Sequence, residues 1–165
     1  MKYCVECGNK LEIKMLENEG MIPFCNKCNS YRFPIFNAGV SAVVLNKERN
    51  KTLFIRQYGK VRNILVAGYI NKGENAEEAL LRELSEEIGV KPIYYEFQKT
   101  HYWEKSNTLL INYYVVLENE IINPNYEVDS YEWYDLDTAY QVVAKGGLAE
   151  EFYKYYYHKN IISNL

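Results

Sequence analysis

The segment from Gly68 to Val90 constrains this chain most, because it marks a helix at both ends. Asn75 is a good N-cap residue, and Glu78 three positions later makes the pair a variant of the capping box. Gly89 suits the left-handed position just past a helix C-terminus. Apolar residues recur every four positions between these ends, at Ala76, Leu80, Leu84 and Ile88. We therefore predict an amphipathic helix that packs its apolar stripe against a sheet.

Three carboxylates occupy adjoining positions of this predicted helix, at Glu83, Glu86 and Glu87. Like charges at this spacing weaken a helix by about 0.2–0.5 kcal/mol per pair. A divalent cation removes the repulsion, and carboxylate oxygens with room for water suit Mg²⁺. A solvated acidic face is the alternative interpretation. Arg82 is spaced to pair with Glu78 or Glu86, or with Glu74 if the preceding loop folds back over the helix.

The whole segment follows the pattern Gly-x5-Glu-x7-Arg-Glu-apolar-x-Glu-Glu-x-Gly-apolar. It resembles the signature of the Nudix hydrolase family at every fixed position. The resemblance implies an α+β fold, a Nudix-type α/β/α sandwich with a mixed sheet. It also implies that the signature forms a loop, a helix and a second loop at the mouth of a cleft, a structural context that would support the motif.

The resemblance further implies a pyrophosphohydrolase that needs Mg²⁺ or Mn²⁺. Its catalytic residues would be Glu74, Arg82, Glu83, Glu86 and Glu87. The last three glutamates would bind the metal, the Arg82–Glu74 ion pair would hold Glu83 in place, and the backbone carbonyl of Ala67 or Gly68 would add a ligand. The general base is a glutamate of this signature, the Nudix box, in some family members and a later carboxylate in others. Later carboxylates stand at Glu118, Glu120 and Glu127, where all three are also interpretable as solvated loop residues.

The four cysteines form two closely spaced pairs near the N-terminus, Cys4-x-x-Cys7 and Cys25-x-x-Cys28. Two such pairs supply the tetrahedral sulfur set that Zn²⁺ accepts, and Gly8 suits the positive φ of the turn after a pair. Because cysteines fill all four positions, this zinc would be structural. Two disulfides, or reduced cysteines packed as small hydrophobic side chains, are the alternatives; polar neighbours and a reducing compartment argue against them.

The character of the sequence changes near Pro34, which predicts a zinc ribbon over residues 1–33 and a Nudix domain over residues 34–165. A ribbon of this size cannot fold on its own core, so metal binding would stabilise it. Strand patterns occupy residues 40–45, 52–57, 64–67, 94–97, 109–117 and 131–134. Helical patterns occupy residues 137–145 and 148–162, with Gly146 and Gly147 between them.

A four-cysteine ribbon before a Nudix domain resembles the arrangement in NADH pyrophosphatases, which implies a substrate of the NADH, NAD⁺ or ADP-ribose type. Those enzymes carry a Ser-Gln-Pro-Trp-Pro-Phe-Pro-x-Ser motif after the signature, whereas this chain has residues 99–106 there and only Trp103 and Ser106 match. The departure puts specificity for NADH in doubt. Tyr102 and Trp103 could stack on a base or serve as core or edge-strand aromatics. His101 is interpreted as a surface residue at a strand end.

The formal net charge of −3 over 165 residues gives no positive field for nucleic acid, so a small-molecule nucleotide is the expected partner and nucleic acid is not. No apolar run suits a bilayer or a signal peptide, so we expect no membrane association and a cytoplasmic protein. The family resemblance leaves a homodimer open. Two alternative functions remain: a nucleotide sensor without hydrolysis, and an RNA-linked Nudix module.

Overall fold

In a computed structural model that describes residues 1–162, the chain forms two compact units, the first of which spans Met1–Phe36. This unit contains one antiparallel sheet in the order β1-β2-β3. Its strands are β1 (Glu12–Leu16), β2 (Gly20–Cys25) and β3 (Ser30–Tyr31). Most of its apolar side chains are exposed, whereas Cys4 and Cys25 are buried. The unit therefore has almost no hydrophobic core apart from its cysteines.

The second unit begins at Asn37 and is built on a mixed six-stranded sheet. The strands pair in the order β7-β8-β4-β5-β9, and β6 pairs with β4. The strand bounds are β4 (Asn37–Leu45), β5 (Lys51–Gln57), β6 (Val66–Tyr69), β7 (Tyr94–Trp103), β8 (Thr108–Val116) and β9 (Val128–Asp135). β4 and β8 run parallel over their whole lengths, and the other pairs are antiparallel.

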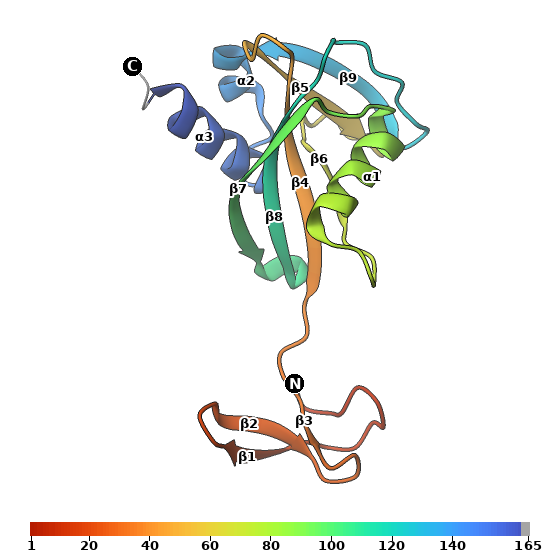
Figure 1. Cartoon of the computed structure of the whole chain (residues 1–165), viewed down its shortest axis with the longest axis vertical. Helices are drawn as coiled ribbons and strands as arrows, with labels where there is room; N and C mark the ends of the chain where they lie inside the picture. Colours follow the sequence, from red (N-terminus) through yellow and green to blue (C-terminus); the bar gives the residue numbers. More distant parts are fainter. Residues whose placement is uncertain (163–165) are drawn as a thin grey trace. The chain divides into compact units, whose positions relative to one another are not determined.

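Helices cover both faces of this sheet (Figure 1). Helix α1 (Ala76–Ile88) lies on one face, and α2 (Leu136–Val142) and α3 (Leu148–Asn160) lie on the other, while η1 (Glu104–Ser106) is a short 3-10 turn. Alternate residues of β4 serve the two faces, since Val44 packs in the α1 core and Val43 packs in the α3 core. The predicted α/β/α sandwich with a mixed sheet is confirmed.

The signature helix has the predicted ends. The Asn75 side chain accepts a hydrogen bond from the Glu78 backbone N–H, the Asn75 backbone N–H donates one to the Glu78 carboxylate, and Gly89 has a φ of 67°. Leu80, Leu84 and Ile88 of the apolar stripe are buried against the sheet. Burial of this stripe supplies most of the stabilisation that α1 needs, since a helix of its length is marginal alone.

Among the elements that differ from the sequence prediction are β7 and α2. β7 continues past residue 97 to Trp103 through a bulge at Phe97/Lys99, and His101 therefore lies within the strand, half-buried, with its Nδ1 2.7 Å from Glu151. α2 ends at Val142 instead of residue 145, because Val143 turns to extended backbone and pairs with Asn63. Within residues 1–162 no helix is long and apolar enough to cross a membrane.

Candidate functional site

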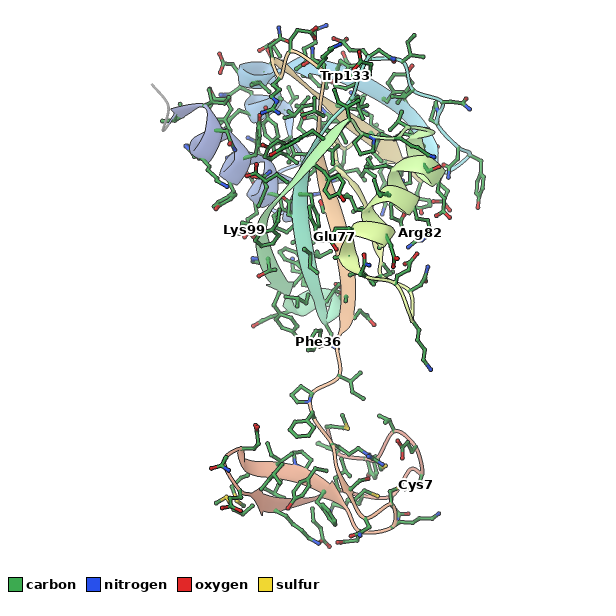
Figure 2. The ribbon with its side chains drawn as sticks, in the orientation of Figure 1. Cys7, Phe36, Glu77, Arg82, Lys99 and Trp133 are labelled. Carbon is green, nitrogen blue, oxygen red and sulfur yellow. The ribbon has the colours of Figure 1, made fainter. Side chains whose placement is uncertain are left out.

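Arg82 is the centre of the signature on α1, on the opposite side of the sheet from Lys99 (Figure 2). Its Nε and Nη2 donate to the two carboxylate oxygens of Glu74 at 2.6 and 3.0 Å, and Nη2 also donates to the Tyr69 carbonyl at 2.8 Å. Its Nη1 donates to Glu83 at 2.7 Å and to Glu86 at 3.0 Å. Arg82 thus ties the loop before the helix to two box carboxylates, and holds the pKa of Glu74 down at about 2.

Glu87 is the buried carboxylate of the signature, with 5% of its surface exposed. Gln57, at the end of β5, donates its Nε2 to Glu87 Oε1 at 2.7 Å. The other oxygen, Oε2, is buried and has no hydrogen-bond partner among residues 1–162. Burial raises the pKa of Glu87 to about 7 although the Gln57 hydrogen bond opposes the shift. A buried carboxylate oxygen without a partner fits a site for a cation.

Gly68 explains why the signature begins with glycine. A Cβ atom added at this position would lie 1.9 Å from the Glu83 carboxylate, so that carboxylate occupies the space of the absent side chain. Gly68 lies in β6 opposite Val40, which fixes the strand against the sheet. The absence of a side chain at Gly68 thus lets the Glu83 carboxylate pack directly against β6.

Of the three later carboxylates, two pair with lysines that lie outside the signature. Glu118 pairs with Lys47, and Glu120 pairs with Lys51 at 3.0 Å and accepts a hydrogen bond from Asn46. These contacts secure the turn between β4 and β5. Both carboxylates therefore fit the alternative interpretation as solvated loop residues.

Glu127 lies near the box instead. The loop before β9 is fastened to the C-terminal end of α1, since the Asn125 N–H donates to the Glu87 carbonyl at 3.0 Å and the Asn123 N–H to the Ile88 carbonyl at 2.9 Å. The Glu127 charge helps to raise the pKa of Glu87 and is the largest cause of the raised pKa of Tyr58. Among the later carboxylates, geometry thus selects Glu127 for a place beside the signature.

A cavity of about 350 Å³ lies on the α3 face of the sheet and reaches the signature. Its walls are mostly apolar, and it is lined by Ser41, Arg62, Ile64, Leu65, Ala67, Gly68, Tyr69, Ser106, Thr108, Leu110, Ala144, Gly147, Leu148 and Ala149. Gly68 lines the cavity and also borders the Glu83 carboxylate. Tyr102 and Trp103 do not line it, so it offers no support for their predicted stacking on a base.

The four cysteine sulfurs of the first unit lie within 4.8 Å of one another. The Cys4–Cys28 and Cys7–Cys25 sulfur pairs are 3.9 and 3.5 Å apart, too long for disulfides and close to the edge of about 3.8 Å expected for a zinc–sulfur tetrahedron. The predicted positive φ of Gly8 is 72°. The Arg32 side chain donates to the Cys4 sulfur at 3.2 Å, and a positive charge beside the cluster favours a thiolate ligand.

The two metal-type clusters differ in how closely they converge. Within residues 1–162, the cysteines form the sole group of three or more ligand residues gathered tightly enough to share one ion. Glu83 and Glu86 turn toward Arg82, so the box carboxylates do not meet at a single point.

A model of the NUDIX domain matches residues 36–157, which is most of the chain. The chain belongs to the NUDIX domain family. It is 23% identical over 158 residues to the NAD-capped RNA hydrolase NudC of Pseudomonas aeruginosa, a match that covers 94% of this chain and 55% of that protein. It is 27% identical over 153 residues to the NAD-capped RNA hydrolase NUDT12 of Homo sapiens, covering 88% and 33%. This NUDIX chain therefore spans about half the length, or less, of these relatives.

Solved structures share the fold of this NUDIX chain at low identity. A NUDIX hydrolase from Nitrosomonas europaea superposes with a TM-score of 0.66 and 16% identity, covering 99% of this chain and 93% of that one. The NUDIX domain of Shewanella oneidensis NrtR, in complex with ADP ribose, gives a TM-score of 0.64 and 18% identity, covering 82% and 93%.

Sequence reasoning missed two features of this site. Gln57 is 30 positions from Glu87, and no local pattern marks it as that carboxylate's partner. Arg62 was also missed, because its place in the cavity depends on the chain returning at Ala144 and Gly147. Both contacts arise from tertiary packing, for which a single sequence carries no periodic signal.

Proposed function

We propose that this chain hydrolyses the pyrophosphate bond of a nucleoside diphosphate joined to a second moiety, of the NADH, NAD⁺ or ADP-ribose type. The observation that carries the proposal is the position of Gly68, which separates the Glu83 carboxylate from a cavity of about 350 Å³. A nucleoside in that cavity would place its phosphates beside the signature. The largely apolar walls suit a base, and the Ser41 and Thr108 side chains supply polar groups for orientation.

Glu83, Glu86 and Glu87 are the proposed ligands of Mg²⁺ or Mn²⁺, with a carbonyl of Ala67 or Gly68 as a further ligand. The oxygen-rich donor set and the partnerless Glu87 Oε2 fit a hard divalent cation. When bound, such an ion neutralises charge on the diphosphate and lowers the pKa of the attacking water. Gln57 holds the opposite oxygen of Glu87, so the oxygen left without a partner keeps a fixed direction.

Glu127 is the proposed general base. A water oxygen forms a bond to one phosphorus, the bridging P–O bond breaks, and the carboxylate takes the water proton. The second phosphate leaves with the bridging oxygen, so a dinucleotide yields two nucleoside monophosphates. Arg82 acts by orientation, because its contacts with Glu74, Glu83 and Glu86 set where the box carboxylates lie.

Two relatives named as NAD-capped RNA hydrolases support a second candidate, an NAD-type group carried on RNA. The bond cleaved is the same in both cases. The cysteine cluster is proposed to hold a structural zinc ion, and a reducing compartment such as the cytoplasm would keep its thiols available. A nucleotide sensor without hydrolysis is less well supported, because Arg82, Gln57 and Gly68 all position box carboxylates.

The test is a product screen with NADH, NAD⁺, ADP-ribose, dinucleoside polyphosphates, nucleoside triphosphates and NAD-capped RNA, with Mg²⁺ or Mn²⁺ in ¹⁸O-labelled water. We expect metal-dependent cleavage of an NAD-type substrate, with one ¹⁸O atom in one monophosphate. Labelled product must disappear in Glu87→Gln. Cleavage that persists without a divalent metal, or that is unchanged in Glu87→Gln, would contradict the proposal.

A further inference from the structure

Arg62 stands at the junction of two cavities. It lines the cavity on the α3 face described above and a second one of about 330 Å³. Ala144 also belongs to both linings, so the two cavities are neighbours. The second cavity is lined by Arg56, Val61, Arg62, Asn63, Gln141, Val142, Val143, Ala144 and Lys145. Its charged lining residues are all basic, in a chain whose net charge is −3.

The positive charges at this junction are unevenly compensated. Arg56 lies 3.2 Å from Glu132, which offsets its charge. Lys145 lies 4.0 Å from Glu150, but that carboxylate is 2.7 Å from Lys154 and is shared between the two. Arg62 has no carboxylate within ion-pair distance among residues 1–162, and the hydrogen bond that its guanidinium donates goes to the Lys145 carbonyl at 3.2 Å. The junction therefore retains uncompensated positive charge.

The backbone fixes this junction. Asn63 forms a parallel bridge with Val143, and the Ala144 N–H donates to the Asn63 carbonyl at 2.9 Å. The Asn63 side chain donates to the Val142 carbonyl at 3.1 Å. These bonds fasten the segment carrying Arg62 to the connection between α2 and α3. The backbone that carries the Arg62 guanidinium is thus held by hydrogen bonds on one side of the cavity.

We propose that the junction of the two cavities, with Arg62 and Lys145, binds a phosphate group on the ribose of the substrate's nucleoside half, separate from the pyrophosphate that is cleaved. The proposal rests on the proposed function, which places the nucleoside in the first cavity. A guanidinium presents a planar fork of donors that matches phosphate oxygens, and a nearby ammonium adds a second charge. Carboxylates near the signature repel such a group, whereas this junction attracts it.

A ribose phosphate occurs in two kinds of substrate. One is a dinucleotide with a 2′-phosphate, such as NADPH. The other is an RNA chain that continues from the 3′-oxygen of an NAD-type cap. The shared chemistry is a phosphate one ribose oxygen away from the bound nucleoside.

The first experiment measures kcat/KM for NADH, NADPH and NAD-capped RNA with wild type, Arg62→Gln, Arg62→Lys and Lys60→Gln. Lys60→Gln is the matched control. Lys60 lies two positions from Arg62 and lines neither cavity, so this variant removes one positive charge outside the proposed subsite. We expect Arg62→Gln to lower kcat/KM for NADPH, capped RNA or both by about 10-fold to 100-fold, mainly through KM, and Arg62→Lys to retain part of it. NADH carries no ribose phosphate, so its kcat/KM should fall at least about 10-fold less than that of the substrate whose phosphate Arg62 binds.

A fall for NADPH alone identifies the 2′-phosphate as the ligand, and a fall for RNA alone identifies the 3′-linked phosphate. Equal losses for all three substrates would show that Arg62 acts on the shared pyrophosphate or nucleoside, and would overturn the proposal. So would no loss for any of them.

Binding tests the subsite separately from hydrolysis. Calorimetry without divalent metal compares 5′-AMP with 2′,5′-ADP and 3′,5′-ADP. We expect at least one bisphosphate to bind wild type about 10-fold more tightly than 5′-AMP, with the preference lost in Arg62→Gln and kept in Lys60→Gln. If the bisphosphate preference is seen while no substrate is cleaved, the proposed function fails and the subsite stands. If cleavage is seen without any bisphosphate preference, the subsite fails alone.

Discussion

The chain carries two clusters of metal-type ligands that are built in opposite ways. The four cysteine sulfurs lie within 4.8 Å of one another, in a unit whose apolar side chains are largely exposed. The box carboxylates lie on α1, whose apolar stripe is buried, and Arg82 draws two of them aside. A site that replaces a core must converge, because the metal itself holds the chain together. A site that serves catalysis can stay open, because the sheet and Arg82 hold its ligands.

The largest effect should come from breaking the cysteine cluster. Cys25→Ser, or removal of metal by a chelator, should abolish zinc binding and unfold residues 1–36, since that unit has little else to stabilise it. Metal analysis and limited proteolysis would show this, with Ser30→Ala as the control on the neighbouring strand. If residues 1–36 resist protease without bound metal, the claim that metal binding takes the place of a core in this unit is wrong.

The next effect concerns Glu127. Glu127→Gln should lower kcat by about 10²–10⁴-fold, the range for loss of a general base, without lowering the melting temperature. Glu118→Gln is the matched control, because its carboxylate pairs with Lys47 on the surface and should change kcat by less than about 2-fold. Equal kcat values for the two variants would mean that Glu127 is not the general base and would favour a glutamate of the signature for that role.

A smaller effect is expected at Gly68. Gly68→Ala forces the Glu83 carboxylate to move, because the new Cβ would lie 1.9 Å from it. We expect kcat to fall by about 10-fold to 100-fold while the Kd for 5′-AMP changes less, since the displacement acts on Glu83, a proposed metal ligand. Gly147→Ala is the control on the other wall of the cavity, where a Cβ would meet nothing closer than 3.8 Å. Similar losses in both variants would mean that the cavity, and not Glu83, is sensitive.

The smallest effect concerns the pH dependence of stability. The pKa of Glu87 is raised from 4.5 to about 7 in the folded protein. The folded state therefore holds this proton more tightly, and the resulting stabilisation is present below about pH 4.5 and lost as the pH rises through 7. The melting temperature of metal-free protein should fall over this window, less so in Glu87→Gln. Parallel profiles would show that Glu87 does not titrate there.

The parts of the fold that sequence predicted are those with local causes. The ends of α1 follow from Asn75, Glu78 and Gly89, which act within five residues of their partners. The spacing of the two cysteine pairs was enough to predict that the four cysteines cluster. The strands β1, β2 and β3 escaped prediction, because they are short, contain few β-branched residues, and β2 includes a glycine and a proline.

The remaining features depend on contacts between distant segments. The parallel pairing of β4 with β8, which positions Ser41 and Leu110 in one cavity wall, joins residues about 70 positions apart. The choice among Glu118, Glu120 and Glu127 required the hydrogen bonds that fasten Asn125 to the end of α1. No feature of the sequence distinguishes the loop carboxylate that lies beside the signature from the other two, so the sequence alone left all three as equal candidates.

The most direct test of a metal-dependent site on α1 is turnover of an NAD-type substrate with Mn²⁺, measured side by side for wild type, Glu87→Gln and Glu118→Gln, with melting curves for each. We expect Glu87→Gln to lose turnover by about 10³-fold or more while it melts at or above the wild-type temperature, because the neutral amide removes the buried negative charge. Glu118→Gln should match wild type. Full turnover in Glu87→Gln, or equal losses in both variants, would contradict the assignment of this site.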